Sequence, residues 1–121
     1  MDDEISAVVA RIGPSVTTVA VTGPLDSVTA AVFTGRLHHV LDGLPSPHSV
    51  ILDLLGVEFL AASGVRALIR AGDRCRARRI DHHLLAGGTV RSLLSLALPP
   101  GNPPLVGPAD RDSLLAELAA R

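Results

Sequence analysis

The 121-residue sequence predicts a single α/β domain, in which a small mixed β-sheet is flanked by about four helices. One observation is the run 50–55, which is apolar except for Asp53, too short for a typical helix and too uniformly apolar for a half-exposed strand. A second is the stretch 63–75, where apolar residues recur with the period of a helix. Because strands and helices alternate along the rest of the chain, we expect residues 1–121 to form one domain, with residues 1–4 as a flexible N-terminus.

The first part of the chain predicts a hairpin followed by a helix. Residues 6–12 and 16–22 are expected to be strands joined by a Gly-Pro-Ser turn. Asp26 or Ser27 can then cap a helix that runs to about Asp42. The core stripe of this helix is expected to contain Ala30, Phe33, Leu37, Val40 and Leu41. A partly apolar side, interpreted as surface, contains Val28, Val32 and His39.

The last part of the chain predicts a buried strand at residues 82–86 and a short helix at residues 89–98. The inward positions of this helix are expected to be Leu93, Leu94 and Ala97. The proline-rich segment 99–108 is expected to be a stiff connector with a brief strand at residues 105–106. A closing amphipathic helix is predicted from the spacing of Leu114, Leu115 and Leu118.

Charge and composition argue against several classes of function. A net charge of −1 and a pI near 6.5 disfavour general affinity for nucleic acid or acidic membranes. No apolar run is long enough to span a bilayer, and the acidic first residues are unlike a secretory signal. We therefore expect no membrane insertion and a cytoplasmic location. The single cysteine, Cys75, is expected to be a core residue, and all eleven basic residues are arginine, which excludes mechanisms that need lysine.

The residues that could support catalysis or metal binding form no recognisable pattern. The pairs His38-His39 and His82-His83 are adjacent in sequence, and neighbours on a strand or a helix point in different directions. Ser63 lacks the elbow motif of a nucleophile, and the glycines form no phosphate-binding fingerprint. We therefore expect no metal, no cofactor and no enzymatic activity.

Asp53, near the end of the predicted central strand, suggests a receiver domain that is phosphorylated on aspartate as an alternative. That chemistry needs an acidic pair after the first strand to hold Mg²⁺, and a lysine near the end of the sheet. In this sequence Asp2 and Asp3 precede the first strand, and lysine is absent. The receiver interpretation is therefore disfavoured.

Arg66, Arg70, Arg74 and Arg78 recur every four residues and share one side of the central helix. This stripe is typical of a solvated helix face, and it is also typical of a ridge that binds an acidic partner surface. The sequence alone leaves both interpretations open.

The loop 56–62, which connects the central strand to the central helix, is the candidate functional site. Ser63 is predicted to be the N-cap, with its hydroxyl accepting a hydrogen bond from one of the first helical N–H groups. Ala61, Ala62 and Ser63 then lie at the electropositive end of the helix dipole, where an anion or a phosphorylated side chain is favoured.

Five short motifs follow one another along nearly the whole chain: Gly23-Pro24-Leu25-Asp26, Ile51-Leu52-Asp53-Leu54, Val57, Phe59-Leu60 and Ser63-Gly64. In their order and spacing they resemble the STAS domain of bacterial anti-sigma factor antagonists. The family fold, a small mixed sheet flanked by helices, matches the fold predicted from the residues themselves.

This resemblance implies a binding module that docks onto an anti-sigma factor, usually a serine kinase, and so releases a sigma factor for transcription. In such antagonists the kinase phosphorylates a Ser or Thr in a D-[ST]-[SA]-G loop, which breaks the complex, and a phosphatase restores it. Here Ala61 and Ala62 stand in place of the aspartate and the acceptor, and Ser63 matches the next position. We therefore hypothesise that the usual switch is absent, with phosphorylation of Ser63 as the alternative.

The predicted partner-binding surface comprises the Asp26 loop, the loop 57–64 and the exposed side of the central helix. Its candidate residues are Asp26, Ser27, Glu58, Phe59, Ala61, Ala62, Ser63, Gly64, Arg66 and Arg70. The expected partners are an anti-sigma factor with serine-kinase activity and a PP2C-type phosphatase, and the expected state is a monomer or weak dimer. The second function considered is a STAS scaffold or regulatory subunit of a stress-signalling or lipid-transport assembly.

Overall fold

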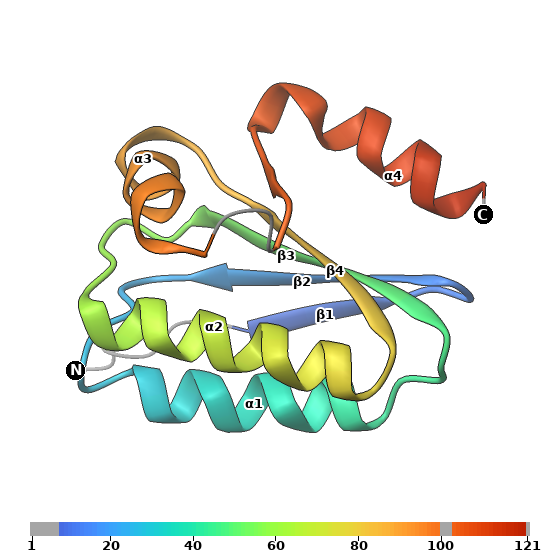
Figure 1. The fold of residues 1–121 in the computed structure, drawn as a ribbon, viewed down its shortest axis with the longest axis horizontal. Coiled ribbons are helices and arrows are strands. Elements are labelled where there is room, and N and C mark those ends of the chain that lie inside the picture. The colour runs from blue at the N-terminus through green and yellow to red at the C-terminus, as the bar shows by residue number, and fades with distance from the viewer. Residues whose placement is uncertain (1–7, 100–102, 121) are drawn as a thin grey trace.

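The computed structural model describes residues 8–99 and 103–120, which form one five-stranded sheet with helices on both faces (Figure 1). The strands are β1 (Val8–Ile12), β2 (Val16–Thr22), β3 (His48–Gly56), β4 (Ile80–Leu85) and β5 (Leu105–Val106). They lie in chain order across the sheet, with β1 antiparallel to β2 and all other neighbours parallel. The predicted mixed α/β sheet is therefore confirmed.

Two helices lie side by side under one face of the sheet, α1 (Ala30–Asp42) and α2 (Ala62–Ala77) (Figure 1). They connect β2 to β3 and β3 to β4, and right-handed connections that advance in one direction place both helices on the same face. α3 (Gly88–Ala97) lies at the end of the sheet where β3 and β4 finish. α4 (Arg111–Ala119), preceded by the 3₁₀ turn Pro108–Asp110, crosses the opposite face.

The sheet separates two apolar clusters. The larger cluster contains inward side chains of β2, β3 and β4 together with residues of α1, α2 and α3, among them Leu52, Phe33 and Leu68. The smaller cluster lies between the sheet and α4 and consists of Ile51, Leu85, Leu114 and Leu118. Because β3 has a cluster on each side, its apolar side chains are buried on both faces from Val50 to Leu54, as predicted. Leu55, also expected to be covered, is 41% exposed because the strand ends beyond the two clusters.

The predicted sides of α1 are confirmed. The buried stripe consists of Phe33, Leu37 and Leu41, with Ala30 and Val40 half-buried at its edges. The side interpreted as surface is exposed and carries Val28, Val32 and His39.

The predicted inward positions of α3 are confirmed for Leu94 and wrong for Leu93 and Ala97. Val90 and Leu94 are buried, whereas Leu93 is 39% exposed and Ala97 is exposed. This short helix has apolar residues on most of its sides, so its periodicity does not decide which stripe contacts the core. The expected flexible N-terminus, residues 1–4, and the start of the first predicted strand lie outside the described residues.

Candidate functional site

The loop after β2 and the loop after β3 form one continuous surface at the same end of the sheet. Leu25 and Leu60 make an isolated parallel bridge between these loops, and both side chains are buried. Three backbone hydrogen bonds join the loops: Gly23 N–H to Gly56 O (3.1 Å), Leu25 N–H to Phe59 O (2.9 Å) and Ala61 N–H to Leu25 O (2.9 Å). The structure thus brings together the Asp26 loop and the loop 57–64.

α2 begins at Ala62, and the prediction of Ser63 as its N-cap is wrong. Ala61 is the N-cap residue, with φ −94° and ψ 172°, and no side chain caps the helix. The hydrogen bond from Ala61 N–H to Leu25 O holds Ala61 at the loop junction, so a tertiary contact decides the helix start against the cap preference of serine. Ser63 instead lies in the first turn, where its Oγ is buried without a hydrogen-bond partner.

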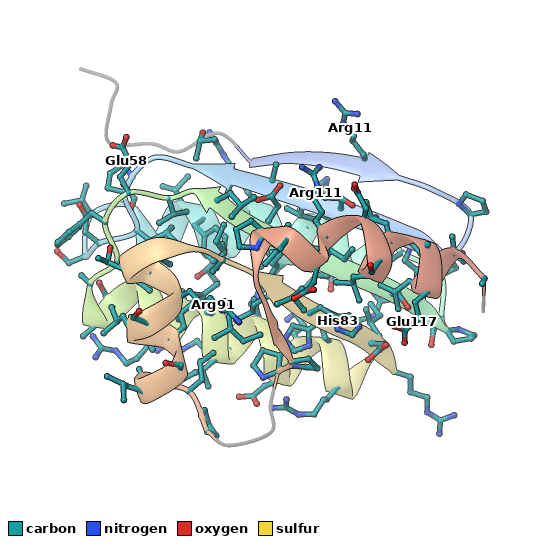
Figure 2. All side chains as sticks on the ribbon, turned by 90° about the horizontal axis from the view of Figure 1, so that it is seen from above. Arg11, Glu58, His83, Arg91, Arg111 and Glu117 are labelled. Carbon is teal, nitrogen blue, oxygen red and sulfur yellow. The ribbon has the colours of Figure 1, made fainter. Side chains whose placement is uncertain are left out.

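The exposed part of this surface is partly apolar. Phe59 is 56% exposed, and Glu58 and Ala62 beside it are also exposed. Figure 2 shows Glu58 at the end of the molecule that carries these loops. Ser27 in the neighbouring loop is exposed as well. An exposed phenyl ring beside the electropositive start of a helix is a feature that a protein partner can bury.

Gly64 is buried and allows α2 to approach the loop after β2. A Cβ at this position would lie 2.6 Å from Leu25 O, 2.9 Å from Leu25 Cβ and 2.8 Å from Leu60 Cδ1. Such distances are well below van der Waals contact, so only glycine fits without rearrangement. Gly64 therefore belongs to the framework of the site and not to its exposed surface.

Asp26 stabilises its own loop. Its Oδ1 accepts hydrogen bonds from the N–H groups of Val28 (2.9 Å) and Thr29 (3.0 Å), and its own N–H donates to Thr29 Oγ1 (3.0 Å). The Thr29 hydroxyl in turn donates to Pro24 O (2.9 Å). The hydrogen bond from the Thr29 N–H is the main cause that lowers the pKa of Asp26. Asp26 thus closes the turn that precedes α1. The helix itself begins at Ala30, with Thr29 as its N-cap residue and no side-chain cap, so the prediction of Asp26 or Ser27 as the cap of this helix is wrong.

The four arginines of the α2 stripe divide into two pairs. Arg74 donates from Nε and Nη2 to the two carboxylate oxygens of Asp42 in α1, at 2.9 and 2.6 Å, which lowers the pKa of Asp42. Arg78 donates to two backbone carbonyls at the end of α1. Arg66 and Arg70 are exposed and, within the part of the chain that the structure describes, form no ion pair. Arg74 and Arg78 therefore join α2 to α1, whereas Arg66 and Arg70 are accessible to a partner.

A groove of about 390 Å³ lies between α1 and α2 beside the two loops. Four candidates from the sequence line it, namely Ser27, Ser63, Arg66 and Arg70. The remaining lining residues, which sequence reasoning missed, are Ala30, Ala31, Thr34 and Ala67. No sequence signal marks these residues, because only the pairing of α1 with α2 places them along one groove.

The cysteine and the most deeply buried histidines belong to the interior. Burial raises the pKa of Cys75 to about 11 and lowers the pKa of His82 to about 4. His48 Nε2 lies 2.8 Å from Thr17 Oγ1, and burial lowers the pKa of His48. Over residues 8–99 and 103–120, no three His, Cys, Asp or Glu side chains are grouped so that they could hold a metal ion. No helix in the same ranges has the length and apolar character needed to cross a membrane.

The chain has relatives of known structure. A family model described as the STAS domain matches residues 7–96. An anti-sigma factor antagonist from Mycobacterium paratuberculosis is 25% identical over 96% of each chain, with a TM-score of 0.78. An anti-sigma-factor antagonist (STAS) domain protein from Planctomyces limnophilus is 19% identical over 90% of this chain and 95% of that chain, with a TM-score of 0.72.

A transporter contains the same fold. The murine anion transporter Slc26a9 is 15% identical over 93% of this chain and 22% of the transporter, with a TM-score of 0.72. At such low identity this similarity and that to the Planctomyces limnophilus protein show the fold alone. No curated protein shows significant sequence similarity to the chain.

Proposed function

The chain belongs to the STAS domain family, and we propose that it is an anti-sigma factor antagonist, which binds an anti-sigma factor of the serine-kinase type and so releases a sigma factor for transcription. The similarity to a solved antagonist over 96% of both chains supports this proposal. The observation that carries it is the continuous surface of two joined loops, from which Phe59 projects with 56% of its surface exposed. In this proposal the protein is a binding module of the cytoplasm and not an enzyme.

The residues of the two loops and of the start of α2 contribute differently to the proposed complex. Burying the ring of Phe59 in a partner pocket would contribute about 1.5–3 kcal/mol. Ala61 and Ala62 have short side chains, so a partner can approach the first N–H groups of α2 closely and supply an acceptor for them. Asp26 and Gly64 hold the two loops in position.

The proposed antagonist lacks the customary phosphorylation switch. Ala61 and Ala62 have no side chain that can accept a phosphoryl group, and a kinase cannot reach the buried Oγ of Ser63 without a rearrangement of the first turn. The protein would therefore remain competent to bind, with control by its abundance.

Incubation with the anti-sigma kinase and ATP, followed by mass spectrometry, tests the missing switch. The wild-type chain should carry no phosphate at Ser63. The double substitution Ala61→Asp with Ala62→Ser rebuilds the D-[ST]-[SA]-G motif, and this variant should become phosphorylated and then lose affinity. Modification of wild-type Ser63 that weakens binding would contradict the missing switch.

Calorimetric titration with the anti-sigma factors encoded in the source genome tests the binding function. Wild-type protein should bind one of them, and Phe59→Ala should bind roughly 10-fold or more weakly. Leu96→Ala is the matched control, because Leu96 is also an exposed apolar residue, 86% exposed, and it does not line the depression that Phe59 shares with Val90 and Leu93 of α3. Failure of every anti-sigma factor to bind would overturn the proposed function.

The similarity to Slc26a9 favours a second candidate, a STAS module attached to a membrane transport assembly. The scaffold of a lipid-transport or stress-signalling assembly belongs to the same class. Affinity purification from the source cell separates the two proposals, because transport components should then replace the anti-sigma factor among the bound proteins.

A further inference from the structure

Charge is distributed very unevenly over the molecule. The segments that form α1, α2 and the two residues after α2 contain seven of the eleven arginines and only two of the twelve acidic residues, a formal charge of +5. The rest of the chain carries −6. The helical layer formed by α1 and α2 therefore presents a basic surface on a protein whose net charge is only −1.

The basic side chains that line the groove between α1 and α2 have no acidic side chain beside them over the described ranges. Further along the same two helices, Asp42 of α1 neutralises Arg74 of α2 through two hydrogen bonds. Beside Arg66 and Arg70, α1 contributes no carboxylate to the groove, only Ser27 from the preceding turn and small residues such as Thr34. Two arginines thus line a groove of about 390 Å³ with no counter-charge from the described residues.

We propose that this groove binds an acidic helix of the anti-sigma factor, with two carboxylates one helical turn apart that pair with Arg66 and Arg70. The inference rests on the proposed function and names the segment of the partner that is recognised. The two carboxylates would pair with Arg66 and Arg70 in the way that Asp42 pairs with Arg74.

The geometry of the groove favours a helix as its occupant. Arg66 and Arg70 are separated by one turn, about 6 Å along α2, and acidic residues at positions i and i+4 of a partner helix have the same spacing. The groove is lined by residues of α1 and α2, and these two helices lie side by side (Figure 1). The small side chains of Ala30, Ala31 and Ala67 leave room for a third backbone to approach. Bidentate pairing of each guanidinium with a carboxylate would fix the register of the partner helix.

Charge reversal in the groove tests this inference against the same purified anti-sigma factor. Arg66→Glu with Arg70→Glu should weaken binding by at least about 10-fold and reduce its dependence on salt. The matched control is Arg11→Glu with Arg111→Glu, which changes the net charge equally but at residues of β1 and α4, away from the groove (Figure 2). This control should change affinity by less than about threefold, since it lacks contact with the partner. Unchanged urea midpoints in both variants would show that each is folded.

A photo-crosslinking residue at Thr34, inside the groove, identifies the occupant directly. The crosslink should map by mass spectrometry to a helical segment with acids at i and i+4, and replacing those acids by arginine should restore binding to the Arg66→Glu, Arg70→Glu variant. A crosslink to a segment without such acids would overturn the inference. Equal affinity of the groove variant and the wild type would also overturn it and leave the proposed function intact, whereas failure of the wild type to bind any anti-sigma factor would overturn both.

Discussion

Replacing Gly64 with alanine should separate the two loops that form the candidate site. The added Cβ would overlap with the carbonyl oxygen and the Cβ of Leu25, so no simple side-chain rotation relieves the clash. Leu60 can turn its methyl group away, but Leu25 is held at both its N–H and its carbonyl oxygen by Phe59 and Ala61. The first turn of α2 must therefore move away from the loop after β2.

The size of the effect follows from two opposing contributions. Overpacking of a buried position costs about 1–3 kcal/mol, while a change from glycine to alanine in a helix contributes up to about 1 kcal/mol. We expect Gly64→Ala to lower the free energy of unfolding by about 1–2 kcal/mol. Gly35 of α1 is the matched control, because an added Cβ there meets nothing within 4 Å. Gly35→Ala should stabilise the protein by about 0.5–1 kcal/mol.

Urea unfolding followed by far-UV circular dichroism measures both variants, since the sequence has neither tryptophan nor tyrosine to report by fluorescence. If the proposed function holds, Gly64→Ala should also bind the anti-sigma factor more weakly than Gly35→Ala does, because the surface around Phe59 shifts. An unfolding midpoint for Gly64→Ala at or above that of the wild type would show that the added Cβ does not clash with Leu25.

Three further predictions concern ionisable groups. Because burial lowers the pKa of His82 to about 4, the unfolded chain takes up a proton that the folded chain does not. The free energy of unfolding should therefore fall by about 2–4 kcal/mol from pH 7 to pH 4, and it should fall less in His82→Leu. If urea unfolding shows the same pH dependence of this free energy in both proteins, His82 is not its cause. Cys75 is buried and its pKa is raised to about 11, so a disulfide reagent such as DTNB should label the thiol only at the rate of unfolding. Immediate labelling of the native protein would contradict this burial. Hydrogen bonds lower the pKa of Asp26, so Asp26→Ala should reduce the urea midpoint at pH 7. That difference should shrink as the pH falls through the folded-state pKa of Asp26, and a difference independent of pH would point to packing alone.

The predicted fold is confirmed where the sequence pattern reflects local geometry. The run 50–55 could be assigned because a strand with helices on both faces needs apolar residues on both sides. The stripe of Phe33, Leu37 and Leu41 could be assigned because the period of a helix places these residues on one side. Asp26 could be recognised as a residue that ends the loop before α1, because its carboxylate accepts bonds from N–H groups only two and three residues away.

The candidate site was predicted only in part. The Asp26 loop and the loop 57–64 were both identified, and the structure joins them. The two loops are joined through the bridge between Leu25 and Leu60, and no periodic pattern in the sequence predicts that these two residues pair. The four arginines of α2 looked equivalent in sequence, but Arg74 has a carboxylate of α1 beside it and Arg66 has none.

The sequence by itself determined which segments are strands and helices and in what order they follow, because residue periodicity and turn chemistry act over a few neighbouring residues. Only the tertiary structure decided that α2 starts at Ala62, that α3 buries Val90 instead of Leu93, and that Arg66 and Arg70 line an open groove. Each of these depends on contacts between residues far apart in the chain, whose energies outweigh local preferences of a kcal/mol or less.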